Sequence, residues 1–182
     1  VSQRQQLLAL FLLTKREPFI LAQLETMSQV SRMTILKDVN EIDAWLHEQN
    51  LRLIRKPHFG VLISGAEHDC QQALTKLLWG ETPFSSDPIT EITHSDGLTF
   101  TLQGDVQLLP LVDYIGEYFS SLHIQRAISL VAKAEEQFGG RFTDDAVLHL
   151  ALVFSVMSNR VKGGNHLEVD DKLITSLQSA KM

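Results

Sequence analysis

The sequence predicts a mainly α fold, with three helices and a β-hairpin followed by an all-helical region. Apolar residues recur at helical spacing through most of the 182 residues. Two short β-like runs, at residues 51–55 and 61–64, flank a stretch that suits a hairpin tip. Residues 80–104 are rich in Gly, Pro, Ser, Thr and Asp, which is typical of a linker or irregular connection. We therefore expect one part over residues 1–79 and a second over residues 105–182.

The first part has the element order of a winged helix-turn-helix. Helical spacing predicts helices over residues 2–15 and 20–27. A third helix is expected to follow Ser31, whose hydroxyl suits an N-cap, and to run to about Gln49. After the hairpin, residues 68–79 return to helical spacing. The predicted core of this part consists of Leu8, Phe11, Leu24, Ile35, Val39, Ile42 and Leu46.

The second part is predicted to be helical throughout. Helices are expected over residues 106–122, over 124–138 up to Gly139, and from a Thr143 cap to Lys162. A last amphipathic segment covers residues 171–177, and a strand is possible near residues 98–102. The chain begins with Val1, which we interpret as excision from a longer protein, so we expect this helical part to be truncated.

The charge distribution restricts where nucleic acid can bind. The formal net charge of −6 argues against generic nucleic-acid binding. Residues 1–60, however, carry 8 Lys and Arg against 6 Asp and Glu, whereas residues 61–182 carry 8 against 16. Because an acidic surface repels phosphates, we expect any contact with DNA in the first third of the chain.

Composition points to a folded cytoplasmic protein. Hydrophobic residues make up 44% of the chain and charged residues 21%. Cys70 is the single cysteine, so no internal disulfide can form, which fits a reducing compartment. The longest apolar stretch, residues 7–13, is too short to span a bilayer, and no signal peptide is visible.

No enzyme site is predicted. The acidic pairs at residues 135–136 and 144–145 are adjacent, so their side chains point to different sides of a helix. The sequence contains no His-x-x-x-His, Cys-x-x-Cys or glycine-rich phosphate loop, and its histidines are scattered. We therefore expect neither a cofactor nor a metal ion.

The start of the third helix is the candidate DNA-reading element. In helix-turn-helix proteins the N-terminal residues of the second helix of the motif face base edges in the major groove. Here Arg32 would read guanine, and Thr34 and Lys37 would contact phosphate beside Ser31. The alternative is a three-helix scaffold with a solvated face. That alternative is favoured by the acidic residues of the same helix, Asp38, Glu41, Asp43 and Glu48.

The predicted hairpin tip carries further basic residues. Arg55, Lys56 and His58 would form a wing that contacts the phosphate backbone. A solvated turn with no ligand is the alternative interpretation.

Residues 30–39, Val-Ser-Arg-Met-Thr-Ile-Leu-Lys-Asp-Val, carry a family resemblance. They resemble the Val-Ser-Arg-x-Thr-Ile-x-x-Asp-Ile signature of regulators of sugar-uptake operons that contain phosphotransferase-system regulation domains, such as the mannitol and lichenan regulators. Residues 59–67 are similar to a hairpin end typical of the second, Mga-like winged helix of these proteins. The resemblance implies an activator or antiterminator that binds operator DNA, forms a homodimer and is phosphorylated by phosphocarrier proteins.

The helical part follows the order of the same family's regulation domain through residues 135–136, 142–145, 150–152 and 160–164. In that pattern the first phosphorylatable histidine falls seven residues before the arginine, where this chain has Val153. His149, one helical turn earlier, either substitutes for it or is an ordinary structural histidine. We expect a poor phosphoryl acceptor. The alternative function is a dimerisation or interaction module that does not bind DNA.

Overall fold

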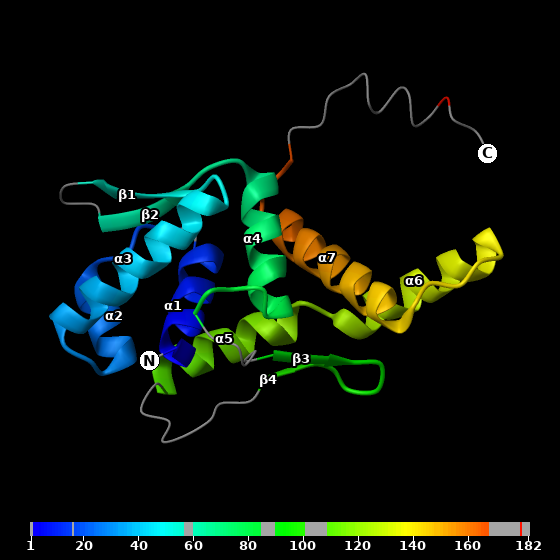
Figure 1. Ribbon diagram of the computed structural model, residues 1–182, viewed down its shortest axis with the longest axis horizontal. Coiled ribbons are helices and arrows are strands. Elements are labelled where there is room, and N and C mark those ends of the chain that lie inside the picture. Colours follow the sequence, from blue (N-terminus) through cyan, green and yellow to red (C-terminus); the bar gives the residue numbers. More distant parts are fainter. Residues whose placement is uncertain are drawn as a thin grey trace.

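A computed structural model describes residues 2–15, 17–56, 60–84, 90–100, 109–167 and Ser179, and the statements below concern these residues. The protein is mainly helical, as predicted, with the first hairpin and α6 at opposite ends of the molecule (Figure 1). The elements in chain order are α1 Ser2–Thr14, α2 Leu21–Ser28, α3 Arg32–Glu48, β1 Arg52–Lys56, β2 Gly60–Ser64, α4 Glu67–Trp79, β3 Thr90–Thr93, β4 Gly97–Phe100, α5 Leu109–Ser121, α6 Ile124–Phe138 and α7 Asp144–Lys162.

Helix α3 begins and ends where the sequence predicts. The side chain of Ser31 accepts a hydrogen bond from the Thr34 backbone N–H at 3.3 Å, which confirms the N-cap. Asn50, just beyond the end of the helix, has a φ of +58°, a conformation that asparagine tolerates better than most residues. All seven predicted core residues are buried. The apolar stripe of α3 therefore faces the interior along its whole length.

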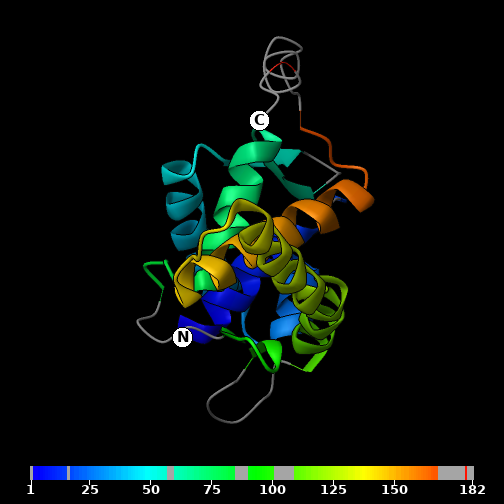
Figure 2. The same ribbon diagram turned by 90° about the vertical axis from the view of Figure 1, so that its right-hand side faces the viewer.

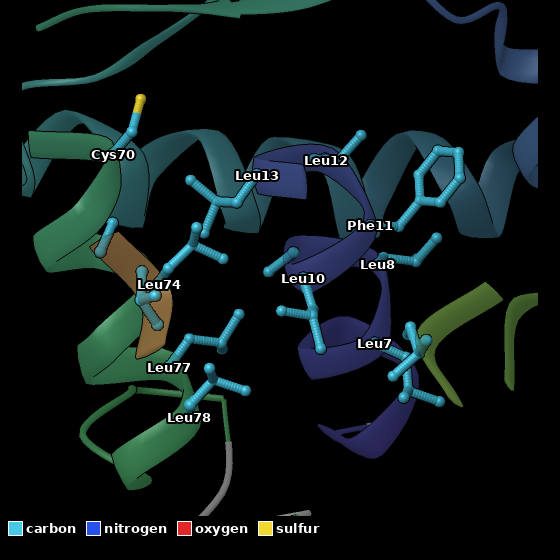
Figure 3. Packing of buried hydrophobic residues seen from close by; sticks show 14 of the residues in the cluster. Leu7, Leu8, Leu10, Phe11, Leu12, Leu13, Cys70, Leu74, Leu77 and Leu78 are labelled. Carbon is cyan, nitrogen blue, oxygen red and sulfur yellow. The ribbon is translucent and has the colours of Figure 1, made fainter. Parts of the chain in front are cut away.

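Helix α1 lies at the centre of the core. Every residue from Leu7 to Leu13 is buried, which is the pattern of a helix covered on all sides. Leu10 and Leu13 point toward Leu74 and Leu77 of α4 (Figure 3). One buried cluster continues from these residues into α5, α6 and α7, so the segment at 80–104 does not separate two independent cores.

The first hairpin is joined to the chain that precedes α2. Strands β1 and β2 pair antiparallel, with Arg55 opposite Val61. Val61 also exchanges two backbone hydrogen bonds with Phe19, of 2.9 and 2.7 Å. Gly60 has a φ of +103°, and a Cβ there would lie 2.3 Å from the carbonyl oxygen of Phe19, so only glycine fits. His58 and the rest of the tip at residues 57–59 lie outside the described residues.

A second hairpin occupies part of the segment expected to be a linker. Strands β3 and β4 pair antiparallel between residues 90 and 100, close to the strand considered possible from the sequence. Gln125 at the start of α6 donates hydrogen bonds to the carbonyls of His94 and Ser95, at 3.1 and 2.9 Å. These bonds attach the hairpin tip to the helical half. Residues 101–108 lie outside the described residues.

Helices α6 and α7 form a helical hairpin, and α7 packs on α4. Figure 2, read with Figure 1, places α4 between α3 and α7. Gly139 ends α6 with a φ of +67°, and Thr143 caps α7 by accepting from the Ala146 N–H at 3.3 Å, both as predicted. No helix in the described ranges is long and apolar enough to cross a membrane. The predicted segment at residues 171–177 lies outside these ranges.

Candidate nucleic-acid interface

The outer face of α3 is exposed at its N-terminal end. The side chains of Arg32 and Lys37 are 62% and 74% exposed, and Met33 is 77% exposed. Met33, Lys37 and Asn40 follow one another at intervals of four and three residues, so they share one face of the helix. The sequence analysis did not single out Asn40, although its spacing from Lys37 was the available signal.

Asp38 does not lie on that outer face. It is 1% exposed, and its carboxylate accepts hydrogen bonds from Arg4 at 2.6 Å and from Gln5 at 3.2 Å. Both partners belong to α1, so Asp38 ties α3 to the central helix. Its negative charge is neutralised inside the protein and does not face a ligand approaching α3.

Two of the other acidic residues of α3 also have partners within the protein. Asp43 accepts from the backbone N–H of Leu53 at 3.1 Å, which attaches the helix to β1. Glu41 accepts a hydrogen bond from Gln5 and lies 4.0 Å from the ammonium group of Lys37. Glu48 is exposed, but it is the last residue of the helix. Asp38 and Asp43 are therefore held by other elements of the protein, whereas Glu41 remains exposed beside Lys37 and opposes the approach of a phosphate there.

Ser31 and Thr34 are placed mainly to start the helix. Their hydroxyl oxygens lie 3.0 Å apart, and the Ser31 oxygen accepts the Thr34 N–H. Arg32 points back to α2, where its guanidinium is 3.3 Å from the carboxylate of Glu25. An exposed ion pair of this kind is weak. Arg32 can therefore exchange Glu25 for another acceptor at little cost.

Arg55 and Lys56, the two basic residues at the end of β1, lie on opposite faces of the hairpin. Arg55 pairs across the hairpin with buried Val61, and its guanidinium donates to the Asn40 side chain at 3.4 Å. Arg55 therefore extends the exposed face of α3. Lys56 is the next residue along the strand, so its side chain leaves from the other face. The sequence analysis grouped them as one wing, and only Arg55 lies beside α3.

His149 lines a cleft of about 580 Å³ between α4 and α7, together with His68, Lys76 and Val153. Its ring packs edge-to-face on Trp79, with the ring centroids 5.0 Å apart. The ammonium group of Lys76 donates to Gln49 at 2.8 Å. Lys76 of α4 and His149 of α7 therefore line the same cleft, so a cation from another helix lies near the candidate phosphorylation site. Arg160, on the same helix as His149, does not line this cleft.

Arg160 has a partner that sequence analysis missed. Its guanidinium donates to both carboxylate oxygens of Glu67, at 2.5 and 2.6 Å, and to the backbone carbonyl of Leu13 at 2.9 Å. Burial works to lower the pKa of Arg160, but the hydrogen bonds and charge of Glu67 outweigh it and raise that pKa. Arg160 therefore joins α7, α4 and α1 at one point.

Cys70 is buried close to this ion pair. Burial raises the pKa of its thiol, although the positive charge of Arg160 acts in the opposite direction. The sequence shows no cation near Cys70, because Arg160 is brought there by the fold. Because the thiolate is the reactive form, a raised pKa makes Cys70 less reactive and indicates a structural role.

Within the described residues, no group of three or more His, Cys, Asp and Glu side chains is placed to hold a metal ion.

In comparisons with known proteins, no family model and no curated protein matches the chain.

Proposed function

We propose that the chain is part of a bacterial transcription regulator of a sugar-uptake operon, in which α1–α3 and the first hairpin form a winged helix that reads DNA. The observation that carries this proposal is the N-terminal face of α3. Arg32 and Lys37 are exposed there, whereas Asp38 is buried against Arg4. The sugar operon, the homodimer and control by phosphocarrier proteins rest on the sequence resemblance.

The dimensions of α3 suit this role. Its 17 residues span about 25 Å, and the major groove, about 12 Å wide, admits an α-helix. In this arrangement Arg32 exchanges Glu25 for a guanine edge, while Lys37 and Arg55 contact phosphates on either side. Ser31 and Thr34 hold the start of the helix, and Lys56 reaches phosphate only from the far face of the hairpin.

Selection from a random-sequence duplex library, followed by a salt titration of the selected duplex, tests the proposal. We expect a preferred sequence, and Lys37→Ala should reduce the slope of log affinity against log salt by about one. Lys133→Ala is the matched control, because Lys133 is an exposed lysine on α6, far from α3. Failure to enrich any sequence, or equal slopes for Lys37→Ala and the unchanged protein, would count against DNA reading.

A second candidate is an interaction module that docks through the same face without binding DNA. It is favoured by Met33, a large apolar side chain of that face that is 77% exposed to solvent. The variant Met33→Lys separates the two functions. It should weaken self-association if the face is a protein interface, and it should strengthen DNA binding if the face meets phosphates. Sedimentation velocity and the duplex titration measure the two outcomes.

A further inference from the structure

A polar cleft lies where the C-terminal ends of α1, α5 and α7 come together. Its volume is about 360 Å³, within the size range of small-molecule sites. Side chains from all three helices line it, among them Thr14 of α1, Tyr114 and Tyr118 of α5, and Arg160 and Lys162 of α7. The cleft is separate from the outer face of α3, and it does not include His149.

The charge of this cleft differs from that of its surroundings. Residues 61–182 carry twice as many acidic as basic residues, yet the described residues that line the cleft include Arg160 and Lys162 and no carboxylate. Glu67 neutralises Arg160 through Nε and Nη2, and the carbonyl of Leu13 takes one proton of Nη1. Among the lining residues that the structure describes, the cleft therefore offers the ammonium group of Lys162 beside the remaining N–H groups of Arg160.

Hydroxyl and amide groups form the rest of the polar lining. The hydroxyls of Thr14 and Tyr114 lie 3.2 Å apart, and Asn159 donates to Ser121 at 2.6 Å. The hydroxyl of Tyr118 is shielded from solvent and has no hydrogen-bond partner among the described residues. An unpartnered buried hydroxyl is costly, so a group that supplies a partner there would be stabilised.

The helix termini select against a highly charged ligand. Helices α1, α5 and α7 all end at this cleft, and the carbonyl groups at helix C-termini carry partial negative charge. Carbonyls accept hydrogen bonds from hydroxyl groups, and their partial negative charge opposes a second anionic group. Lys162 supplies one positive charge and Arg160 its remaining N–H donors, so the chemistry fits a ligand with a single phosphate and several hydroxyls.

We infer that this cleft binds a small phosphate monoester of a polyol, such as a sugar phosphate. Lys162 and the free N–H groups of Arg160 take the phosphate, and Tyr114, Tyr118 and Asn159 bind the hydroxyls. Since Arg160 also holds Glu67 and Leu13, the bound ligand contacts the point that joins the two halves of the protein. This inference does not depend on DNA binding.

Isothermal titration calorimetry of the whole chain tests the site. The probes are glucose 6-phosphate, fructose 6-phosphate and glycerol 3-phosphate, with glucose and inorganic phosphate as the separated halves of the ligand. We expect saturable binding of at least one phosphate ester, weakened roughly tenfold by Lys162→Ala and less by Tyr118→Phe. Lys133→Ala on α6 serves as the control and should bind like the unchanged protein.

Three results would overturn the inference. No saturable binding of any of the three esters at about 10 mM would show that there is no such site. Inorganic phosphate binding as tightly as the esters would show an anion site without polyol recognition. Unchanged affinity in Lys162→Ala would place the binding elsewhere, and circular dichroism of that variant would confirm that it is folded.

Discussion

Glu67 and Arg160, 93 residues apart in the chain, form a two-pronged ion pair that joins the start of α4 to the end of α7. The same guanidinium donates to the carbonyl of Leu13, so it also holds the end of α1. The two side chains are only 15% and 11% exposed. Because both charges are largely shielded from water, removing either side chain leaves the other as an unpaired buried charge, which destabilises the folded state.

Arg160→Ala should therefore destabilise the protein by about 3 kcal/mol, near the lower end of the cost of breaking a buried pair. Urea denaturation measures this cost. The double variant Glu67→Gln, Arg160→Met is the comparison, and it should recover part of the loss because no unpaired charge remains. A cost below about 1 kcal/mol for Arg160→Ala would show that the pair behaves like a surface ion pair.

Cys70 should react slowly with alkylating reagents. Burial raises its pKa above the ordinary value of 9.0, so at about pH 8 the folded protein holds less thiolate than the unfolded chain. The folded state also keeps its proton over a pH range in which the unfolded state has lost it. The contribution of Cys70 to the free energy of unfolding is therefore lost as the pH rises above 9.0.

Alkylation by iodoacetamide, with and without urea, provides the measurement for Cys70. Cys70 should be alkylated far more slowly in the folded protein than in urea. The pH at which the alkylation rate of the folded protein reaches half its maximum should lie above 9.0. Equal rates in the two states at about pH 8 would contradict a raised thiol pKa.

The sequence was sufficient for features that depend on neighbouring residues. The helical spacing of Ile35, Val39, Ile42 and Leu46 predicted α3, and the caps at Ser31 and Thr143 predicted the starts of α3 and α7 at the correct residues. Capping and helical periodicity act over a few residues, so a sequence displays them directly. The mainly helical fold class follows from these local signals.

Pairings between distant segments could not be predicted. Asp38 appeared to be a repulsive charge on the DNA-facing helix, and its partner Arg4 lies 34 residues away on another helix. Arg160 appeared only as a landmark of a family pattern, and the structure gives it Glu67. No local pattern encodes these contacts, because they arise only when the helices pack. These ion pairs determine which charged side chains are still available to bind a ligand.

If the exposed N-terminal face of α3 reads DNA as proposed, Arg32→Ala should relax base preference and cost roughly 1–3 kcal/mol in binding. Arg32 is the exposed arginine at the N-terminus of α3, and its bond to Glu25 is weak enough to exchange. A titration with the selected duplex and with single-base variants measures both effects. If discrimination between these duplexes is the same in Arg32→Ala, base reading by this residue is excluded.

The hairpin arginine and lysine should behave differently from each other. Lys56→Ala should weaken binding to all sequences and reduce the salt slope by about one if the hairpin contacts phosphate. Arg55→Ala should have the larger effect, because its guanidinium lies against Asn40 on the α3 face, whereas Lys56 leaves from the opposite face. The same salt titration compares the two variants. A larger loss in Lys56→Ala would mean that the hairpin meets DNA through its far side.

His149 should be a poor phosphoryl acceptor, and the reason is its surroundings on α7. In the family pattern that the sequence resembles, Val153 occupies the position of the phosphorylated histidine. Arg160 lies 11 residues after His149 on the same helix, about 16 Å along its axis, so it cannot pair with a phosphate on His149. Phosphate adds nearly two negative charges. Lys76 lines the same cleft and offers one cation, but Glu81 lines it too and opposes an added negative charge.

Incubation with the phosphorylated histidine carrier of the sugar-uptake system, followed by intact-mass measurement, tests this expectation. We expect well under one phosphate per chain, with no difference between the unchanged protein and His149→Ala. A gain of one phosphate that disappears in His149→Ala would contradict it and would make Val153 irrelevant to the choice of acceptor. In that case Lys76→Ala should reduce the yield, because Lys76 is the cation that lines the cleft of His149 from another helix. His166→Ala, a change at an exposed histidine that does not line the cleft, should leave the yield unchanged.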